Sequence, residues 1–122
     1  MNSSSGRTEP TFQILTALVG EPLHGYGIIQ EIDRLSEGQT HLRVGTLYGA
    51  LDRLASEGLV VLDREEAVSG RLRRYYRLTD AGAQVLAADA ERMASQAEVA
   101  IGRLRTREAK RQARGTLAGG AI

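Results

Sequence analysis

The sequence lacks several residue types whose absence restricts what the protein can do. Its 122 residues include no cysteine and no tryptophan, and the aromatic residues are four tyrosines and one phenylalanine. Without cysteine there is no disulfide framework, zinc finger or thiol nucleophile. The two histidines, His24 and His41, belong to no Ser-His-acid set and to no metal-ligand cluster, and no glycine-rich phosphate loop precedes a helix. We therefore expect no catalysis, no metal and no cofactor.

An excess of charge of one sign is also missing. Sixteen Lys and Arg residues stand against 15 Asp and Glu residues, a formal net charge of +1, so any affinity for nucleic acid must come from local clusters. No apolar run approaches the roughly 18 residues that a membrane-spanning helix needs. The first residues lack the hydrophobic region of a secretory signal. These absences predict a cytoplasmic protein that makes no use of a membrane.

The segment from Arg43 to Ser56 predicts a helix with two unlike faces. Its apolar stripe consists of Val44, Leu47, Leu51 and Leu54, and its opposite face of Gly45, Thr46, Gly49, Ala50 and Arg53. Each interior glycine costs a helix about 1 kcal/mol relative to alanine. A helix that keeps two of them is suited to close approach by another surface, such as the floor of the DNA major groove. The pattern favours a DNA-recognition helix over a plain core helix, which would carry Glu, Lys or Gln there.

Two strand-like runs follow this helix. Leu59–Leu62 and Arg74–Leu78 are separated by a polar segment that ends in the turn signal Ser69-Gly70. Four arginines and no acid lie between Arg71 and Arg77. A helix-turn-helix followed by a basic hairpin is a winged helix-turn-helix, in which the hairpin, or wing, lies along the DNA. The alternative for the arginines is an ordinary solvated face.

The segment before the recognition helix predicts two further helices. The first begins at Pro10, has an apolar face of Phe12, Leu15, Leu18 and Val19, and is stopped by residues 20–22. The second opens at residues 24–27 and has an inner stripe of Ile28, Ile32 and Leu35. The fold class is therefore mainly α with a small β-hairpin. We expect residues 1–9 to be a disordered tail and residues 10–79 to form the winged helix-turn-helix domain.

A long helical pattern begins after Thr79, which is a good N-cap residue, and runs to about Arg107. Its heptad-like seam consists of Leu86, Ala90, Met93, Ala97, Ala100 and Leu104. The simplest use of this seam is packing against a second copy, which makes residues 80–108 a dimerisation helix; the alternative is that the helix folds back on its own domain. An alanine-rich seam buries little area, so we expect the first helix to contribute to the dimer.

A basic run from Arg103 to Arg114 contains six cations and only Glu108 against them. We expect residues 109–122 to be a basic, disordered tail. The run has two interpretations, a contact with flanking DNA or a solvated, fraying helix end, and the second is favoured.

A series of short motifs resembles the PadR family of bacterial transcriptional regulators. The motifs are His24–Tyr26, Gly45–Tyr48, Leu51–Leu54, Glu57–Leu59 and Arg74–Thr79, followed by Gly82. No single motif is specific, but their order and spacing are, and the resemblance spans roughly residues 12–105. It implies a homodimeric repressor of the shorter type, with one C-terminal dimerisation helix. Such proteins bind inverted-repeat operators in double-stranded DNA and are often released by a small molecule or another signal.

The resemblance also implies roles for individual residues. In the family the tyrosines of the first two motifs lie near the DNA backbone, where a phenol can offer its hydroxyl to a phosphate. An ordinary core tyrosine is the alternative for the first of them, and an ion pair with Asp52 or Glu57 is the alternative for the arginine of the recognition helix. The expected DNA-binding residues are Tyr26, Arg43, Thr46, Tyr48, Gly49, Arg53, Arg71, Arg73 and Arg74.

The chain departs from the family pattern in its C-terminal helix. Some members place a tryptophan there, which stacks flat aromatic drugs at the dimer centre, whereas this chain has Met93, Ala97 and other alanines in that region. A methionine can contact an aromatic ligand but more often fills a seam. A multidrug-binding pore is therefore in doubt, and a small-molecule effector at the dimer interface is expected only in general terms.

A different class of function is left open by the near-neutral charge. A small adaptor or dimerisation module without DNA binding would need no basic surface. The arginines of the wing and the small residues on the recognition helix count against it.

Overall fold

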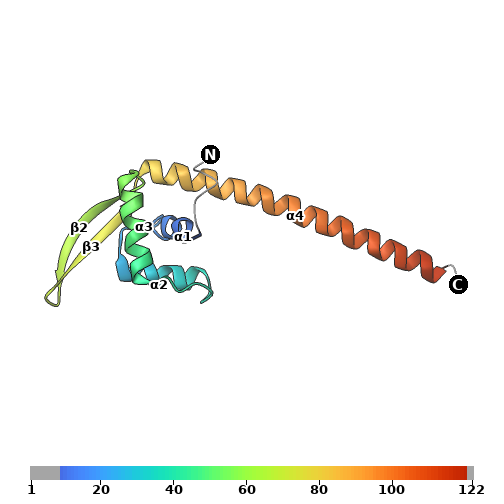
Figure 1. The fold of residues 1–122 in the computed structure, drawn as a ribbon, viewed down its shortest axis with the longest axis horizontal. Helices are drawn as coiled ribbons and strands as arrows, with labels where there is room; N and C mark the ends of the chain where they lie inside the picture. Colours follow the sequence, from blue (N-terminus) through green and yellow to red (C-terminus); the bar gives the residue numbers. More distant parts are fainter. Residues whose placement is uncertain (1–8, 121–122) are drawn as a thin grey trace. The chain divides into compact units, whose positions relative to one another are not determined.

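The computed structural model describes residues 9–120, with side chains to residue 116, and divides the chain into two units, residues 1–89 and residues 90–122. The elements in chain order are α1 (Glu9–Ala17), β1 (Leu23–His24), α2 (Gly25–Leu35), α3 (Val44–Ser56), β2 (Val60–Val68), β3 (Arg71–Leu78) and α4 (Asp80–Gly120) (Figure 1). The predicted class, mainly helical with a small sheet, is confirmed. The tail expected over residues 1–9 lies outside the described residues, apart from Glu9, which begins α1.

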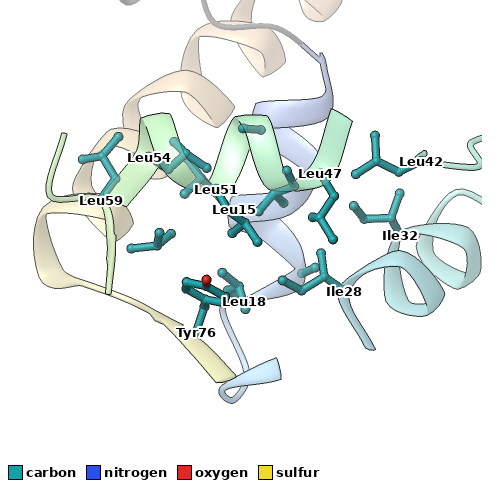
Figure 2. Close-up of a cluster of buried hydrophobic side chains, with 14 residues drawn as sticks. Leu15, Leu18, Ile28, Ile32, Leu42, Leu47, Leu51, Leu54, Leu59 and Tyr76 are labelled. Atoms are coloured by element: carbon teal, nitrogen blue, oxygen red, sulfur yellow. The ribbon is translucent and has the colours of Figure 1, made fainter. Parts of the chain in front are cut away.

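The three helices α1, α2 and α3 pack around one hydrophobic core, which is closed by the start of β2 and by Tyr76 of β3 (Figure 2). Helix α3 contributes Leu47, Leu51 and Leu54, whose spacing of four and three residues places them on one side of the helix. Two expectations for this helix were wrong. Ala50 is 1% exposed, because it lies one turn from both Leu47 and Leu54, whereas Val44 is 61% exposed in the first turn of the helix.

The ends of the first two helices are more exposed than expected. Val19 and Leu35 are exposed, whereas Ile14, which was not expected on the apolar face of α1, is fully buried. Val19 lies beyond the last residue of α1, so the helical spacing that would have turned it inward no longer applies, and Leu35 is the last residue of α2. Ala17, the last residue of α1, and Leu18 just beyond it are nevertheless buried in the core.

The sheet has three antiparallel strands in the order β1-β3-β2. Strand β1 was not expected, because two residues carry no readable periodicity; it pairs His24 with Tyr75. The polar segment expected between the strands is itself strand, since β2 continues to Val68 along an exposed hairpin that requires no apolar face. The predicted turn at Ser69-Gly70 is confirmed, with φ of 52° and 78°.

The end of α3 and the start of α4 are tied together at Thr79. Its hydroxyl donates to the carbonyl oxygen of Gly58 at 2.7 Å and accepts from the backbone N–H of Gly82 at 3.0 Å, which is the N-cap predicted for this residue. Gly82 packs directly on this junction, because a β carbon there would overlap the carbonyl oxygen of Leu59. The junction fixes the direction in which α4 begins.

Helix α4 is longer than predicted. It continues to Gly120, whereas residues 109–122 were expected to be a disordered tail. The residues after position 107 are mostly strong helix formers, and the Glu108 carboxylate lies 3.5 Å from Arg111 and accepts from the Gln112 amide at 3.3 Å. Local helix propensity therefore extends the helix through the basic run. No helix within residues 9–120 has the length and apolarity needed to cross a bilayer.

Candidate nucleic-acid interface

The exposed face of α3 carries two glycines and so has few protruding side chains. Thr46, Gly49 and Arg53 are all exposed, and a β carbon built at Gly45 or Gly49 would meet nothing within 4 Å. The Arg53 guanidinium lies along this face and donates to the Gly49 carbonyl oxygen at 3.4 Å. Nothing inside the chain therefore requires glycine at either position. A surface that approaches this face closely would account for two glycines that weaken the helix.

Arg43 lies at the N-terminal end of the same face. It is the N-cap residue of α3 in an extended backbone conformation, and its side chain is exposed and makes no capping hydrogen bond. The guanidinium cannot cap the helix, because arginine has only hydrogen-bond donors and the free backbone groups at a helix N-terminus are donors as well. The side chain is thus available to a phosphate or to a guanine edge next to the positive end of the helix.

A groove of about 480 Å³ lies between the helices and the hairpin. It brings together five of the nine residues expected to bind DNA, namely Tyr26, Tyr48, Arg71, Arg73 and Arg74, along with His24, Gly25, Val68, Ser69 and Leu72. Tyr26 is 65% exposed, which excludes the alternative of a core tyrosine. Residues from α2, α3 and the wing therefore share one surface, and that surface is lined by hydroxyl groups and cations.

Gly25 allows the segment that carries Tyr26 to pack closely against Tyr48. A β carbon at this position would overlap the hydroxyl oxygen of Tyr48. The Tyr48 phenol therefore lies directly over the first residue of α2, and it is still 43% exposed. Glycine is needed here for close approach rather than for backbone freedom.

The wing is less basic than the sequence of β3 alone predicts. Strand β2 places acids opposite the arginines of β3: Arg74 lies 3.3 Å from Glu65, and Arg77 lies 3.4 Å from Asp63. Arg64 pairs with Asp63 at 3.0 Å and with Glu66 at 2.8 Å, and it covers the Tyr75 ring at 4.0 Å. The expectation of an acid-free cluster thus fails for Arg74 and Arg77, because strand pairing joins residues that are distant in the sequence.

Arg71 is the wing cation with the least internal compensation, because it pairs in register with Val68, whereas Arg73 pairs with Glu66. Within the described residues neither arginine forms an ion pair, and both are exposed on the groove. The hydrogen bond from Arg64, more than any other interaction, holds the pKa of Glu66 below its ordinary value, and the charge of Arg73 helps to lower it. Of the three wing arginines expected to bind DNA, Arg71 and Arg73 are therefore the two without an ion pair, and Arg71 has no acid opposite it.

His24 was not counted among the site residues, although it lines the groove. It is the N-cap residue of α2 but makes no capping hydrogen bond, and its ring lies 5.3 Å from that of Tyr75. Burial, and to a lesser degree the charge of Arg73, lowers the pKa of His24 below its ordinary value. The signal that would have found it was its place in the His-Gly-Tyr motif. The other histidine, His41, lies 2.6 Å from Asp33, and the described residues contain no cluster able to hold a metal.

The residues of the expected dimerisation seam lie on α4. Leu86 is half-buried against the core, whereas Met93 is 41% and Leu104 is 62% exposed. The three seam alanines, Ala90, Ala97 and Ala100, are also exposed. This exposure is what an interface that requires a second chain would show.

These observations define a class of protein. Three helices, an exposed small-residue face on the third and a hairpin beside it form a winged helix-turn-helix. The sequence model of the transcriptional regulator PadR-like family matches residues 14–88, which is more than half of the chain. The chain belongs to this family of transcriptional regulators.

Individual relatives agree with this assignment. The chain is 33% identical over 96 residues to transcriptional regulator Rv3488 of Mycobacterium tuberculosis, covering 79% of this chain and 86% of that protein. A PadR family transcription regulator from Clostridium difficile R20291 has a TM-score of 0.65 and 26% identity, covering 75% of this chain and 94% of that one. Bacillus subtilis PadR, whose structure is a complex with operator DNA, has a TM-score of 0.57 and 25% identity, covering 64% of this chain and 44% of that one.

Proposed function

We propose that this protein binds an inverted-repeat operator as a homodimer and represses transcription there. The observation that carries the proposal is the combination on one side of the molecule's first unit: the glycine-rich face of α3, exposed Arg43 and the groove lined by Tyr26, Tyr48, Arg71 and Arg73. The relative from Bacillus subtilis, crystallised with operator DNA, supports the same use of the fold.

Each part of this surface has a chemical task in the proposal. The face of α3 around Thr46 and Gly49 enters the major groove, where the missing side chains bring the helix backbone close to the base edges. Arg53 borders that face. The two tyrosines and the wing arginines bind phosphates and hold the helix in register. The seam on α4 joins two copies, and a small-molecule effector binds between them. An operator with two half-sites follows from the two-fold symmetry of such a dimer.

The test is binding of the purified protein to the DNA upstream of its own gene, compared with a scrambled duplex over a series of salt concentrations. We expect preference for the native duplex, a steep loss of affinity with salt and saturation at one dimer per inverted repeat. Equal weak binding to both duplexes would contradict a sequence-specific operator at that site, and no binding even at low salt would favour the adaptor alternative.

A pair of variants tests the recognition helix directly. Gly49→Glu places a long anion on the face proposed to meet the bases, so operator affinity should fall by at least about 100-fold, since each good base contact is worth about 1–3 kcal/mol and the anion also faces phosphates. Ala55→Glu puts the same side chain at an exposed site in the last turn of α3 and should lower affinity far less. Normal operator binding by Gly49→Glu, with the fold intact by circular dichroism, would contradict this use of α3.

A further inference from the structure

The C-terminal part of α4 carries a concentration of positive charge that the proposed operator contacts do not use. Helix α4 continues through this part, and its side chains are exposed as far as residue 116. Five of the six cations between positions 103 and 114 fall on one side of the helix, which we call the distal basic face: Arg103, Arg107, Lys110, Arg111 and Arg114. Within the described residues, only Arg111 of these five has an acidic partner, Glu108 at 3.5 Å.

The distal basic face begins where the apolar seam ends. The seam spacing of four and three residues, continued past Leu104, falls on Arg107, Arg111 and Arg114. In a parallel pair of helices these arginines would face their own copies and repel one another. An antiparallel pair centred on the apolar seam would carry Arg111 and Arg114 past the start of the other helix. The last part of α4 is therefore unsuited to self-association, although its helix continues.

The chemistry of the distal basic face fits a phosphate backbone. Four of its five cations are arginines, whose planar guanidinium groups bind phosphate oxygens in pairs. From Arg103 to Arg114 the helix rises about 17 Å at about 1.5 Å per residue. A DNA duplex carries one phosphate charge per roughly 1.7 Å of axis. A membrane surface fits less well, because an interfacial helix needs a broad apolar face beside its cations, and Leu104 is the only large apolar side chain from residue 103 to residue 116.

We propose that the distal basic face is a second, sequence-independent contact surface for double-stranded DNA, which binds phosphates outside the bases that α3 reads. The inference rests on the proposed function, since it supposes that the protein is on DNA already. Its consequence is an affinity that depends on salt more steeply than the helix-turn-helix and the wing alone would produce.

The experiment uses the full chain and compares three variants on one operator duplex with long flanks. In the triple variant Arg107→Gln/Arg111→Gln/Arg114→Gln, each lost phosphate contact makes the slope of log affinity against log salt shallower by about 0.9. Three lost contacts in each chain therefore change the slope by about 2.7 per chain and by about 5.4 for a dimer on its operator. We expect affinity at moderate salt to fall by at least about tenfold. The matched control Arg107→Lys/Arg111→Lys/Arg114→Lys keeps the charge and should retain the native slope. The single change Arg105→Gln, off the distal basic face, should leave affinity within about twofold.

The outcomes separate this inference from the proposed function. If the native protein prefers its operator and the triple glutamine variant shows an unchanged slope and affinity, the distal basic face binds no DNA and the inference is overturned alone. If the triple glutamine variant changes its sedimentation coefficient with no change in salt slope, the face contacts protein instead, which also overturns it. A native protein that binds no duplex overturns the proposed function itself. If the native protein and the triple glutamine variant have equal helicity by circular dichroism, a shallower salt slope in the variant reflects the lost charges and not a loss of helix.

Discussion

At the scale of single residues, glycine has two different uses in this protein. At Gly45 and Gly49 a β carbon would meet nothing within 4 Å, so packing inside the chain does not require glycine there, and the proposed contact with DNA would. At Gly25 and Gly82 a β carbon would overlap atoms of Tyr48 and Leu59, so the need arises from packing within it. The sequence predicts the first kind from its helical face, but the partners of the second kind become visible only in the folded chain.

Gly25→Ala tests the contact between the two tyrosine motifs. The added methyl group must displace the Tyr48 phenol, which lowers the free energy of unfolding by about 1–3 kcal/mol, as overpacking usually does. Because Tyr48 is proposed to bind a phosphate, operator affinity should fall as well, by about tenfold. Urea unfolding and an operator titration measure the two effects.

The control for this variant is Gly20→Ala, at a glycine whose added β carbon would meet nothing within 4 Å. It should change neither stability nor affinity appreciably. If Gly25→Ala kept the native operator affinity, Tyr48 would have no phosphate to bind from its observed position.

At the scale of elements, strand pairing decides the charge of the wing. The arginines of β3 were predicted from sequence as one basic cluster, but β2 pairs with that strand and sets Asp63 and Glu65 against Arg77 and Arg74. An exposed ion pair contributes little stability, yet it lowers the net charge that a phosphate would meet. The same register sets Glu66 opposite Arg73, so the uncompensated positive charge of the wing is concentrated toward Arg71, next to its turn.

Thr79→Ala tests the junction at which α4 begins. The variant loses both the N-cap hydrogen bond to Gly82 and the hydrogen bond to Gly58, so the free energy of unfolding should fall by about 1–2 kcal/mol. Thermal or urea unfolding measures the change. Thr106→Ala is the matched control, because the Thr106 hydroxyl donates only to the Gly102 carbonyl within an exposed helix, and it should alter stability by less than about 0.5 kcal/mol. Equal losses in the two variants would argue against a special role for the junction.

At the scale of the whole molecule, the proposed dimer depends on a seam that has few large side chains. Met93 and Leu104 are its large exposed members, and alanines fill the positions between them. Such a seam allows close approach of two helices but buries little apolar area, and hydrophobic stabilisation scales with that area. The dimer should therefore be sensitive to a single charge at its centre.

Met93→Asp places that charge in the seam and should convert the dimer into a monomer, which sedimentation velocity would detect. The monomer should also bind its operator at least about tenfold more weakly, because only one half-site is held at a time. Ser95→Asp adds the same charge at an exposed position off the seam and should leave the dimer intact. A Met93→Asp protein with the native sedimentation coefficient would place the interface elsewhere.

The sequence by itself determined the class of fold, the order of the helices and the wing, the turn at Ser69-Gly70 and the cap at Thr79, because each of these depends on residues close together in the chain. It also led to the family, through motifs with fixed spacing. Tertiary structure decided the burial of Ala50, the acids set against the wing, the place of His24 in the groove and the contact of Gly25 with Tyr48. Each of these features either joins residues from different elements or depends on the exact angles at which helices and strands pack. Neither local propensity nor periodicity contains that information.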